Sequence, residues 1–143
     1  MRVVLDTNIL VSAAIKPNGQ AGRILAYLRQ DAFSLLYSRE SLAELVDVLT
    51  RPHLRKKYRL TEHYLHFFLH LIRLRGEMVT PDREITICRD PDDDKFLAIA
   101  VRGQADYLVS QDEDLLTLSF FEGIPIVKPE DFLKRLEHET TNK

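Results

Sequence analysis

The amino-acid sequence predicts an α/β fold in which helices cover both faces of a mostly parallel sheet, giving three layers. Short apolar runs rich in β-branched residues alternate along the chain with longer segments whose apolar residues recur at helical spacing. Capping residues, Pro and Gly stand at the boundaries between these segments. Regular alternation of strands and helices is typical of parallel sheets, which are buried on both faces.

The first four elements follow this alternation. Val3–Leu5 is an apolar, β-branched run and predicts a buried strand. A small helix is predicted over Ile9–Ile15, and the turn residues of Lys16–Gly19 end it. The apolar residues of Ala21–Arg29 lie on one side of a predicted helix, and Phe33–Tyr37 is the second predicted strand.

Two helices with clear N-terminal signals come next. Ser38 is a good N-cap for a helix over Leu42–Leu49, whose apolar residues recur at i, i+3, i+4 and i+7. Thr61 caps a longer predicted helix over Glu62–Arg75, and Gly76 ends it.

The middle of the chain has weaker strand signals. Met78–Val79 and Ile85–Ile87 are short apolar runs and are candidates for strands. Asp90, followed by Pro at the first helical position, then begins a predicted helix over 91–102, and Gly103 is its expected end.

The C-terminal part returns to the same alternation. The sequence predicts a strand, a short helix, a strand and a closing helix over Asp106–Val109, Asp112–Leu118, Ile124–Val127 and Pro129–Glu137. No internal repeat, low-complexity tract or Gly/Ser-rich linker divides the 143 residues. We therefore expect one domain over residues 1–135, followed by a frayed polar tail over residues 136–143.

Composition and charge narrow the range of functions. The net charge of −2 gives no global attraction to nucleic acid or to an anionic membrane, so nucleic-acid binding has to rest on a local basic patch. The apolar runs are far shorter than the roughly 20 residues of a membrane span, and Met1–Asp6 reaches an acidic residue too early for a signal peptide. Cys88 is the single cysteine, which suits a reducing compartment. We expect a cytoplasmic protein.

Four acidic residues that are distant in sequence stand where this fold brings side chains together. Asp6 and Asp112 each follow a predicted strand, Asp94 lies in the first turn of a helix, and Glu44 lies on an earlier helix. The carboxyl ends of parallel strands converge on one crevice, so we expect these acids to meet there. Close carboxylates repel one another by about 4 kcal/mol per pair. Such a group favours a divalent cation, and its hard oxygen ligands suit Mg²⁺ or Mn²⁺.

The first two acids also have purely structural interpretations. Asp, Thr and Asn all cap helices well, so Asp6, Thr7 and Asn8 fit the start of a helix. In the functional interpretation Asp6 binds the metal, while Thr7 and Asn8 orient it or touch the substrate. Glu44 lies across its helix from the apolar stripe, and on local evidence alone it is a solvated side chain.

The acids in the first turn of the helix predicted over 91–102 can be interpreted in two ways. Carboxylates in the first turn of a helix complement the helix dipole, which explains one or two of the successive aspartates at 92–94. The mutual repulsion of all three favours a bound cation. Asp94 falls at the edge of the apolar face of this helix and is the expected metal ligand. Asp93 is expected to lie outside the direct ligands of the metal, in a supporting role.

The segment around Asp112 has a similar ambiguity. Ser110 and Glu113 have the spacing of a capping box, which is a purely structural feature. The functional interpretation places Asp112 opposite Asp6 and leaves Ser110 and Asp114 as supporting groups.

A basic run opened by Pro52 offers contacts to a phosphate backbone. Six basic or histidine residues crowd nine positions of the chain: Arg51, His53, Arg55, Lys56, Lys57 and Arg59. Most runs of this kind are solvated surface, but beside an acidic metal site they are natural phosphate contacts. The candidate RNA contacts are Arg51, Arg55, Lys56 and Lys57.

The order of these motifs resembles that of PIN-domain nucleases. Four strings carry the resemblance: VVLDTNIL around Asp6, EL at Glu44, DKFLAIA from Asp94 and LVSQDEDL around Asp112. Each string alone is a weak signal, but four in this order, from Arg2 to about Leu133, are specific. Within that superfamily the chain is most similar to the VapC-like toxins of prokaryotic toxin–antitoxin systems.

This resemblance implies a Rossmann-like α/β/α sandwich with a central, mostly parallel sheet, and Mg²⁺- or Mn²⁺-dependent hydrolysis of RNA phosphodiester bonds. It implies that Asp6, Glu44, Asp94 and Asp112 form the catalytic and metal-binding site. It also implies homodimers and a small antitoxin protein that inserts a segment into the site. Gln111 is a departure, because related sequences often carry a basic residue there that contacts the phosphate backbone.

Two other classes of protein fit parts of the same pattern. A phosphoaspartate receiver domain also places acids at strand ends, and Lys128 stands where a receiver needs a lysine after its last strand. However, Leu5 and Thr7 flank Asp6, so the pair of acids that a receiver needs there is missing. The other alternative is a PIN-like module that binds a protein partner without catalysis, and the presence of all four acids argues against it.

Overall fold

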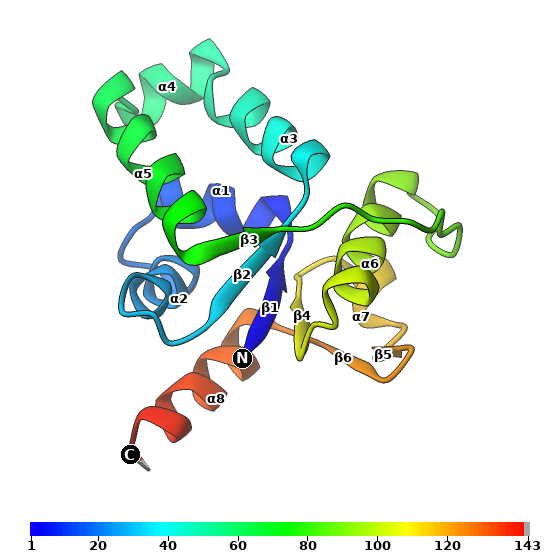
Figure 1. Ribbon diagram of the computed structural model, residues 1–143. Coiled ribbons are helices and arrows are strands. Elements are labelled where there is room, and N and C mark those ends of the chain that lie inside the picture. Colours follow the sequence, from blue (N-terminus) through cyan, green and yellow to red (C-terminus); the bar gives the residue numbers. More distant parts are fainter. Residues whose placement is uncertain (142–143) are drawn as a thin grey trace.

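Parallel strands with helices on both faces make up the structure, as the sequence predicts (Figure 1). The computed structural model describes residues 1–141, and the strands among them form one six-stranded sheet in the order β3-β2-β1-β4-β6-β5. The strands are β1 (Arg2–Leu5), β2 (Ser34–Tyr37), β3 (Gly76–Met78), β4 (Tyr107–Val109), β5 (Phe120–Phe121) and β6 (Ile124–Val127). All neighbouring strands are parallel except the β5–β6 pair, which is antiparallel.

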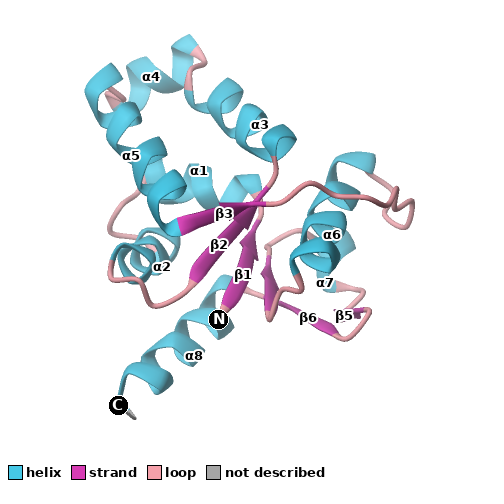
Figure 2. Cartoon of the chain, viewed as in Figure 1, coloured by secondary structure: helices cyan, strands magenta, loops and turns pink. Residues whose placement is uncertain are grey.

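The helices connect the strands and form the two outer layers (Figure 2). In the described part of the chain they are α1 (Thr7–Ile15), α2 (Gln20–Arg29), α3 (Arg39–Leu49), α4 (Pro52–Tyr58), α5 (Glu62–Arg75), α6 (Pro91–Gly103), α7 (Glu113–Leu116) and α8 (Pro129–Thr141). Helices α1, α2, α3, α5 and α8 contribute to the core on one face of the sheet, and α6 and α7 to the core on the other. None of these helices has the length and apolar composition to cross a bilayer.

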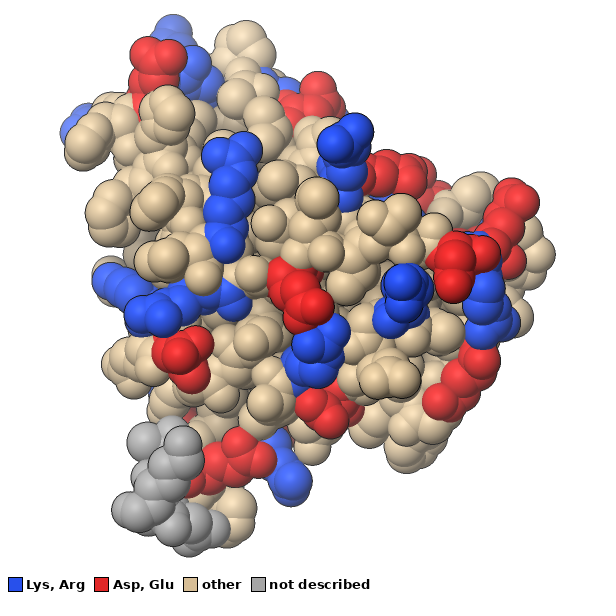
Figure 3. Space-filling model, viewed as in Figure 1, with Lys and Arg blue, Asp and Glu red and all other residues tan. Residues whose placement is uncertain are grey.

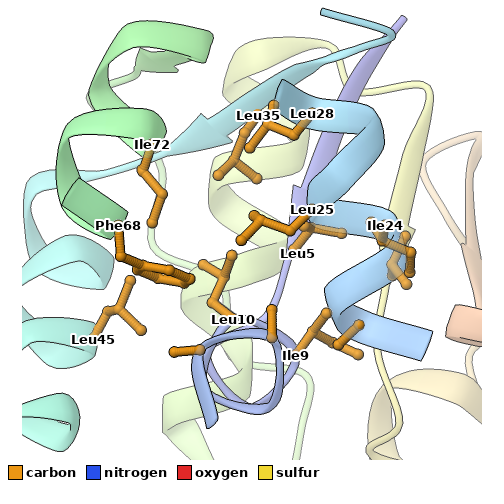
Figure 4. Close-up of a cluster of buried hydrophobic side chains, with 14 of the residues drawn as sticks. Leu5, Ile9, Leu10, Ile24, Leu25, Leu28, Leu35, Leu45, Phe68 and Ile72 are labelled. Atoms are coloured by element: carbon orange, nitrogen blue, oxygen red, sulfur yellow. The ribbon is translucent and has the colours of Figure 1, made fainter. Parts of the chain in front are cut away.

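Each face of the sheet has its own hydrophobic core, because successive residues of a strand point to opposite faces. In β1, Val3 and Leu5 face the larger core, whereas Val4 faces the smaller core under α6. In β2, Leu35 and Leu36 divide in the same way. Figure 4 shows the larger core, where side chains from α1, α2, α3 and α5 surround Leu5 and Leu35. The sheet is therefore fixed from both sides, and its carboxyl edge is held rigidly.

The connection between β3 and α6 is a loop, so the strand predicted at Ile85–Ile87 is wrong. Ile85 does pack into the smaller core. The backbone amides of Ile87 and Cys88, however, donate hydrogen bonds of 3.1 and 2.8 Å to the Asp94 carboxylate. Amides that bind a carboxylate are not available for a strand ladder, and this explains the absence of a strand here.

Other differences from the prediction concern short or terminal elements. The basic run forms the helix α4, and the two-residue strand β5 is too short to leave a periodic signal in the sequence. The closing helix α8 was expected to end at Glu137 but continues to Thr141, and Leu136 lies within the larger core. Helix therefore occupies most of the segment expected as a polar tail, and residues 142–143 of that tail lie outside the described residues.

We predict that the core under α6 is critical for stability. Leu97 is 0% exposed, so Leu97→Ala should lower the free energy of unfolding by about 2–5 kcal/mol. Leu74 of α5 is 62% exposed, and Leu74→Ala should change the free energy of unfolding by no more than about 0.5 kcal/mol. Urea unfolding of both variants, followed by circular dichroism, measures the difference. Equal losses would contradict the packing of α6 against the sheet.

Candidate metal centre

The structure brings three aspartates together at the carboxyl edge of the sheet. Asp93, Asp112 and Asp114 each place one carboxylate oxygen so that the three oxygens lie within 4.8 Å of one another. Asp93 comes from the first turn of α6, and the other two come from the start of α7. All three side chains are half-buried. Asp6 and Glu44 lie near this group, since the Asp112 and Glu44 charges both act to raise the pKa of Asp6.

Asp6 serves the fold and the site at the same time. One of its oxygens accepts a hydrogen bond of 3.0 Å from the amide of Ile9 and so caps α1. The other oxygen accepts a 2.5 Å bond from the Ser110 hydroxyl. Burial raises the pKa of Asp6, hydrogen bonds from Ser110 and Ile9 act to lower it, and the charges of Asp112 and Glu44 act to raise it. The capping interpretation and the site interpretation are therefore compatible, one for each oxygen.

Ser110 links Asp6 to Asp112. Its hydroxyl donates to Asp6 and also accepts a 2.9 Å hydrogen bond from the backbone amide of Asp112. The cap of α7 is Asp112, whose carboxylate accepts a 2.8 Å bond from the amide of Asp114, and not Ser110. The capping box considered for Ser110 and Glu113 is therefore not the arrangement found.

Asp93, and not Asp94, lies in the acidic group. Asp94 is buried, and one of its oxygens accepts the two backbone amide bonds from the loop before α6. Asp93 has a buried oxygen, Oδ2, without any hydrogen-bond partner among the described residues. Burial, and after it the nearby charges of Asp112, Asp90, Asp114 and Asp6, raises the pKa of Asp93 to about 6.

The spacing of buried residues along α6 does not single out Asp93. Residues three, four and seven positions after Asp93 are Phe96, Leu97 and Ala100, and all three are buried. The residues three and four positions after Asp94 are Leu97 and Ala98, which are buried as well, and Asp94 is itself more buried than Asp93. The residue seven positions after Asp94 is Val101, which is only partly buried. One helical position, about 100°, separates the residue expected in the group from the residue found there.

Glu44 is held by a lysine of the neighbouring helix. The Lys95 ammonium forms an ion pair with Glu44 Oε2, which links α6 to α3. Lys95 is 11% exposed and Glu44 is 32% exposed, so the pair is largely shielded from water. Glu44 is therefore not the solvated side chain that local sequence evidence suggested.

The remaining candidates differ in how close they lie to the acids. Thr7 is buried at the first position of α1 and Asn8 is exposed beside it, but the recorded partners of the Asp6 carboxylate are Ile9 and Ser110. Asp114 is within the acidic group, where an exposed arginine, Arg89, donates to it at 2.6 Å.

The basic residues form a separate surface at the outer end of α3. Arg55, Lys56 and Arg59 line an open hollow of about 430 Å³. Arg51 and Lys57 are exposed nearby, and Arg51 lies 3.3 Å from Asp47. Figure 1 places α4 away from α6 and α7, so this basic surface is not beside the acids as expected. On the face drawn in Figure 3, positive and negative side chains are interspersed and form no continuous basic stripe.

The acidic group fits a divalent cation. Lys95 pairs with Glu44 and Arg89 pairs with Asp114, while Asp6, Asp93 and Asp112 make no ion pair within residues 1–139. Half-buried carboxylates without a cation repel one another and are costly to bury. The buried Oδ2 atom of Asp93 accepts no hydrogen bond from a described residue, so this oxygen can bind a metal ion. Hard carboxylate oxygens at this spacing are the ligands that Mg²⁺ and Mn²⁺ prefer.

Comparison with known proteins agrees with this architecture. The sequence model of a family described as the PIN domain matches residues 2–114. The uncharacterized protein MJ1680 of Methanocaldococcus jannaschii is 32% identical over 118 residues, which span 82% of this chain and 75% of that protein.

Two solved structures have a similar fold. One chain in the crystal structure of VapBC2 from Rickettsia felis, bound to a DNA fragment from their promoter, has a TM-score of 0.59. It is 19% identical, and the match covers 90% of this chain and 98% of that one. PAE2754 from Pyrobaculum aerophilum has a TM-score of 0.58 at 17% identity, covering 96% of this chain and 90% of that one. At these identities the likeness concerns the fold alone.

The raised pKa of Asp93, about 6 against an ordinary value of 3.8, predicts a pH-dependent gain in stability when its charge is removed. The folded chain binds this proton more tightly than the unfolded chain, so the wild type loses stability as pH rises through about 6. In EDTA, Asp93→Asn should therefore raise the Tm by about 2–6 °C at pH 7.5, and the gain should vanish toward pH 4.

Thermal unfolding monitored by circular dichroism across this pH range measures the effect. Asp92→Asn is the matched control, because it removes an exposed charge from the same helical turn and should give no gain at any pH. A lower Tm of Asp93→Asn at pH 7.5 would contradict the crowding of Asp93 among the other acids.

Proposed function

Since the chain belongs to the PIN-domain family, we propose that it is a divalent-metal-dependent endoribonuclease that hydrolyses RNA phosphodiester bonds. The observation that carries this proposal is the group of carboxylates without basic partners at the carboxyl edge of the sheet. Asp6, Asp93 and Asp112 come from three different strand–helix junctions and converge there. Helix capping explains one oxygen each of Asp6 and Asp112, but not why carboxylates without basic partners are brought together, so a bound cation is the most economical explanation of the group.

Asp93, Asp112 and Asp114 are the residues proposed to hold Mg²⁺ or Mn²⁺, with Asp6 beside them. A divalent ion held there would supply positive charge for the phosphate oxygens in the transition state and would promote ionisation of an attacking water. Ser110 keeps the Asp6 carboxylate and the start of α7 in a fixed relation. Asp94 holds the loop before α6 through the Cys88 amide, so it positions the helix that carries Asp93. In-line attack of water would leave a 5′-phosphate and a 3′-hydroxyl.

We further propose that the protein is the toxin of a toxin–antitoxin pair. The likeness of its fold to a chain of the VapBC2 complex supports a small antitoxin as partner. An apolar surface for a protein partner or a second copy is available on α5 and β3, where Phe67, Leu74 and Met78 are 64%, 62% and 53% exposed.

A non-catalytic binding module remains the second candidate, favoured by the ion pairs that already occupy Glu44 and Asp114. In that case the acids would bind a partner's basic side chains. The cleavage experiment separates this candidate from the nuclease. The receiver interpretation is not retained, because the chain matches the PIN-domain family over residues 2–114.

We predict cleavage of labelled single-stranded or structured RNA with Mg²⁺ or Mn²⁺, and none with EDTA. Asp93→Asn should lower the rate by about 10²–10³-fold, the size expected when one group that stabilises developing charge is lost. Asp92→Asn, which alters the neighbouring exposed carboxylate, should keep the rate within about threefold.

The outcomes of this assay are distinct. Cutting that co-purifies with the protein and survives both EDTA and Asp93→Asn would contradict the assignment. A folded wild type that binds Mn²⁺ but cuts no RNA would favour the binding module.

The basic surface on α4 should contribute to RNA affinity through phosphate contacts. Lys56 is exposed beside the hollow, so Lys56→Gln should weaken binding and reduce the slope of log K against log salt by about 0.7. Lys134→Gln on α8, at the opposite end of the molecule in Figure 1, should leave the slope unchanged. Fluorescence anisotropy with single-stranded RNA in EDTA at several salt concentrations measures both. Identical slopes for the two variants would remove α4 from the RNA interface.

A further inference from the structure

A lysine lies among the acids of this site. Lys95 stands two residues after Asp93 on α6, and its ammonium reaches Glu44 on α3. Only 11% of the Lys95 side chain is exposed, which is low for the residue type that is most often found in solvent. A shielded ammonium needs a carboxylate partner, and Glu44 supplies it. The two side chains form a fixed cation–anion pair at one side of the acidic group.

We propose that Lys95 is the fixed cation of this site, which therefore binds one divalent ion and not two. In this assignment, which rests on the proposed function, the ion is held by Asp93, Asp112 and Asp114. Glu44 is a positioning residue for Lys95 and does not bind metal. The Lys95 ammonium takes the place that a second ion would occupy and contacts a phosphate of the RNA.

The charges around the site support a single ion. Of the five acids Asp6, Glu44, Asp93, Asp112 and Asp114, Lys95 and Arg89 neutralise Glu44 and Asp114, and the other three make no ion pair with a described residue. One divalent ion offsets most of that charge. A second ion near Glu44 would have to displace Lys95 and leave its ammonium shielded and unpaired, which is costly. A lysine is also a compact point charge that suits contact with a phosphate.

The position of Lys95 allows that contact. Lys95 and Asp94 line a hollow of about 550 Å³ between the start of α3 and the loop before α6. Arg39 and Arg83 line the same hollow. Glu40 and Glu84 line it as well, so the walls carry charges of both signs. Lys95 therefore stands at the boundary between the acids and a surface cavity that is large enough for a nucleotide.

The number of ions is measured directly by titration with Mn²⁺, following the free ion by electron paramagnetic resonance without RNA. We expect one Mn²⁺ per chain in the wild type and in Glu44→Gln, with dissociation constants within about threefold of each other. Asp93→Asn should weaken that binding by at least about tenfold. Two ions in the wild type, of which Glu44→Gln loses one, would overturn the proposal.

A second measurement tests the phosphate contact without metal. In EDTA, Lys95→Met should lower the affinity for single-stranded RNA and reduce the salt slope by about 0.7, while Lys95→Arg should keep the slope of the wild type. Circular dichroism establishes that each variant is folded. Equal slopes for Lys95→Met and the wild type would overturn the contact.

These outcomes separate this proposal from the proposed function. One bound ion and a Lys95-dependent salt slope in a protein that cuts no RNA would support Lys95 as the fixed cation while removing the nuclease. Two bound ions in an active nuclease would support the proposed function and overturn Lys95 as the substitute for a second ion. A wild type that binds no Mn²⁺ would overturn both.

Discussion

The site depends on the parallel register between β1 and β4. This register pairs Leu5 with Val109, so the next residues of the two strands, Asp6 and Ser110, come side by side at the carboxyl edge. The 2.5 Å hydrogen bond from the Ser110 hydroxyl to Asp6 joins the two strand ends, and the amide of Asp112 bonds to the same hydroxyl. A one-residue slip would turn these side chains to the opposite face of the sheet. The separate cores on the two faces hold the register in place.

Helix caps reduce the cost of bringing so many acids together. Asp6, Asp90 and Asp112 cap α1, α6 and α7, and each accepts a backbone hydrogen bond with one oxygen. The N-terminal ends of helices carry partial positive charge, which favours carboxylates there. Such interactions satisfy only part of each side chain. Asp112 also lies in the acidic group with Asp93 and Asp114, so a residue that begins a helix also contributes to the demand for a cation.

The sequence was sufficient to predict those features that depend on residues close together along the chain. An apolar strand followed by a capping residue located Asp6, and residues typical of helix ends located α5 and α6. The distinction between Asp93 and Asp94 was not within reach, because both residues lie in the same turn and buried residues follow each of them at helical spacing. The pairing of Lys95 with Glu44 depends on how α3 approaches α6. That approach is a property of the packed structure and has no local signal in the sequence.

The separation of the basic helix from the acids constrains any RNA that uses both. Helix α3 has 11 residues and spans about 16 Å, and α4 begins beyond its far end. A strand bound on α4 has to follow α3 to reach Asp93. With a net charge of −2, the protein has no general attraction for polyanions to offset a missing contact along that path. Under the proposed function, an RNA that contacts both α4 and Lys95 has to follow α3, so the path along α3 is the natural place for selection among RNAs.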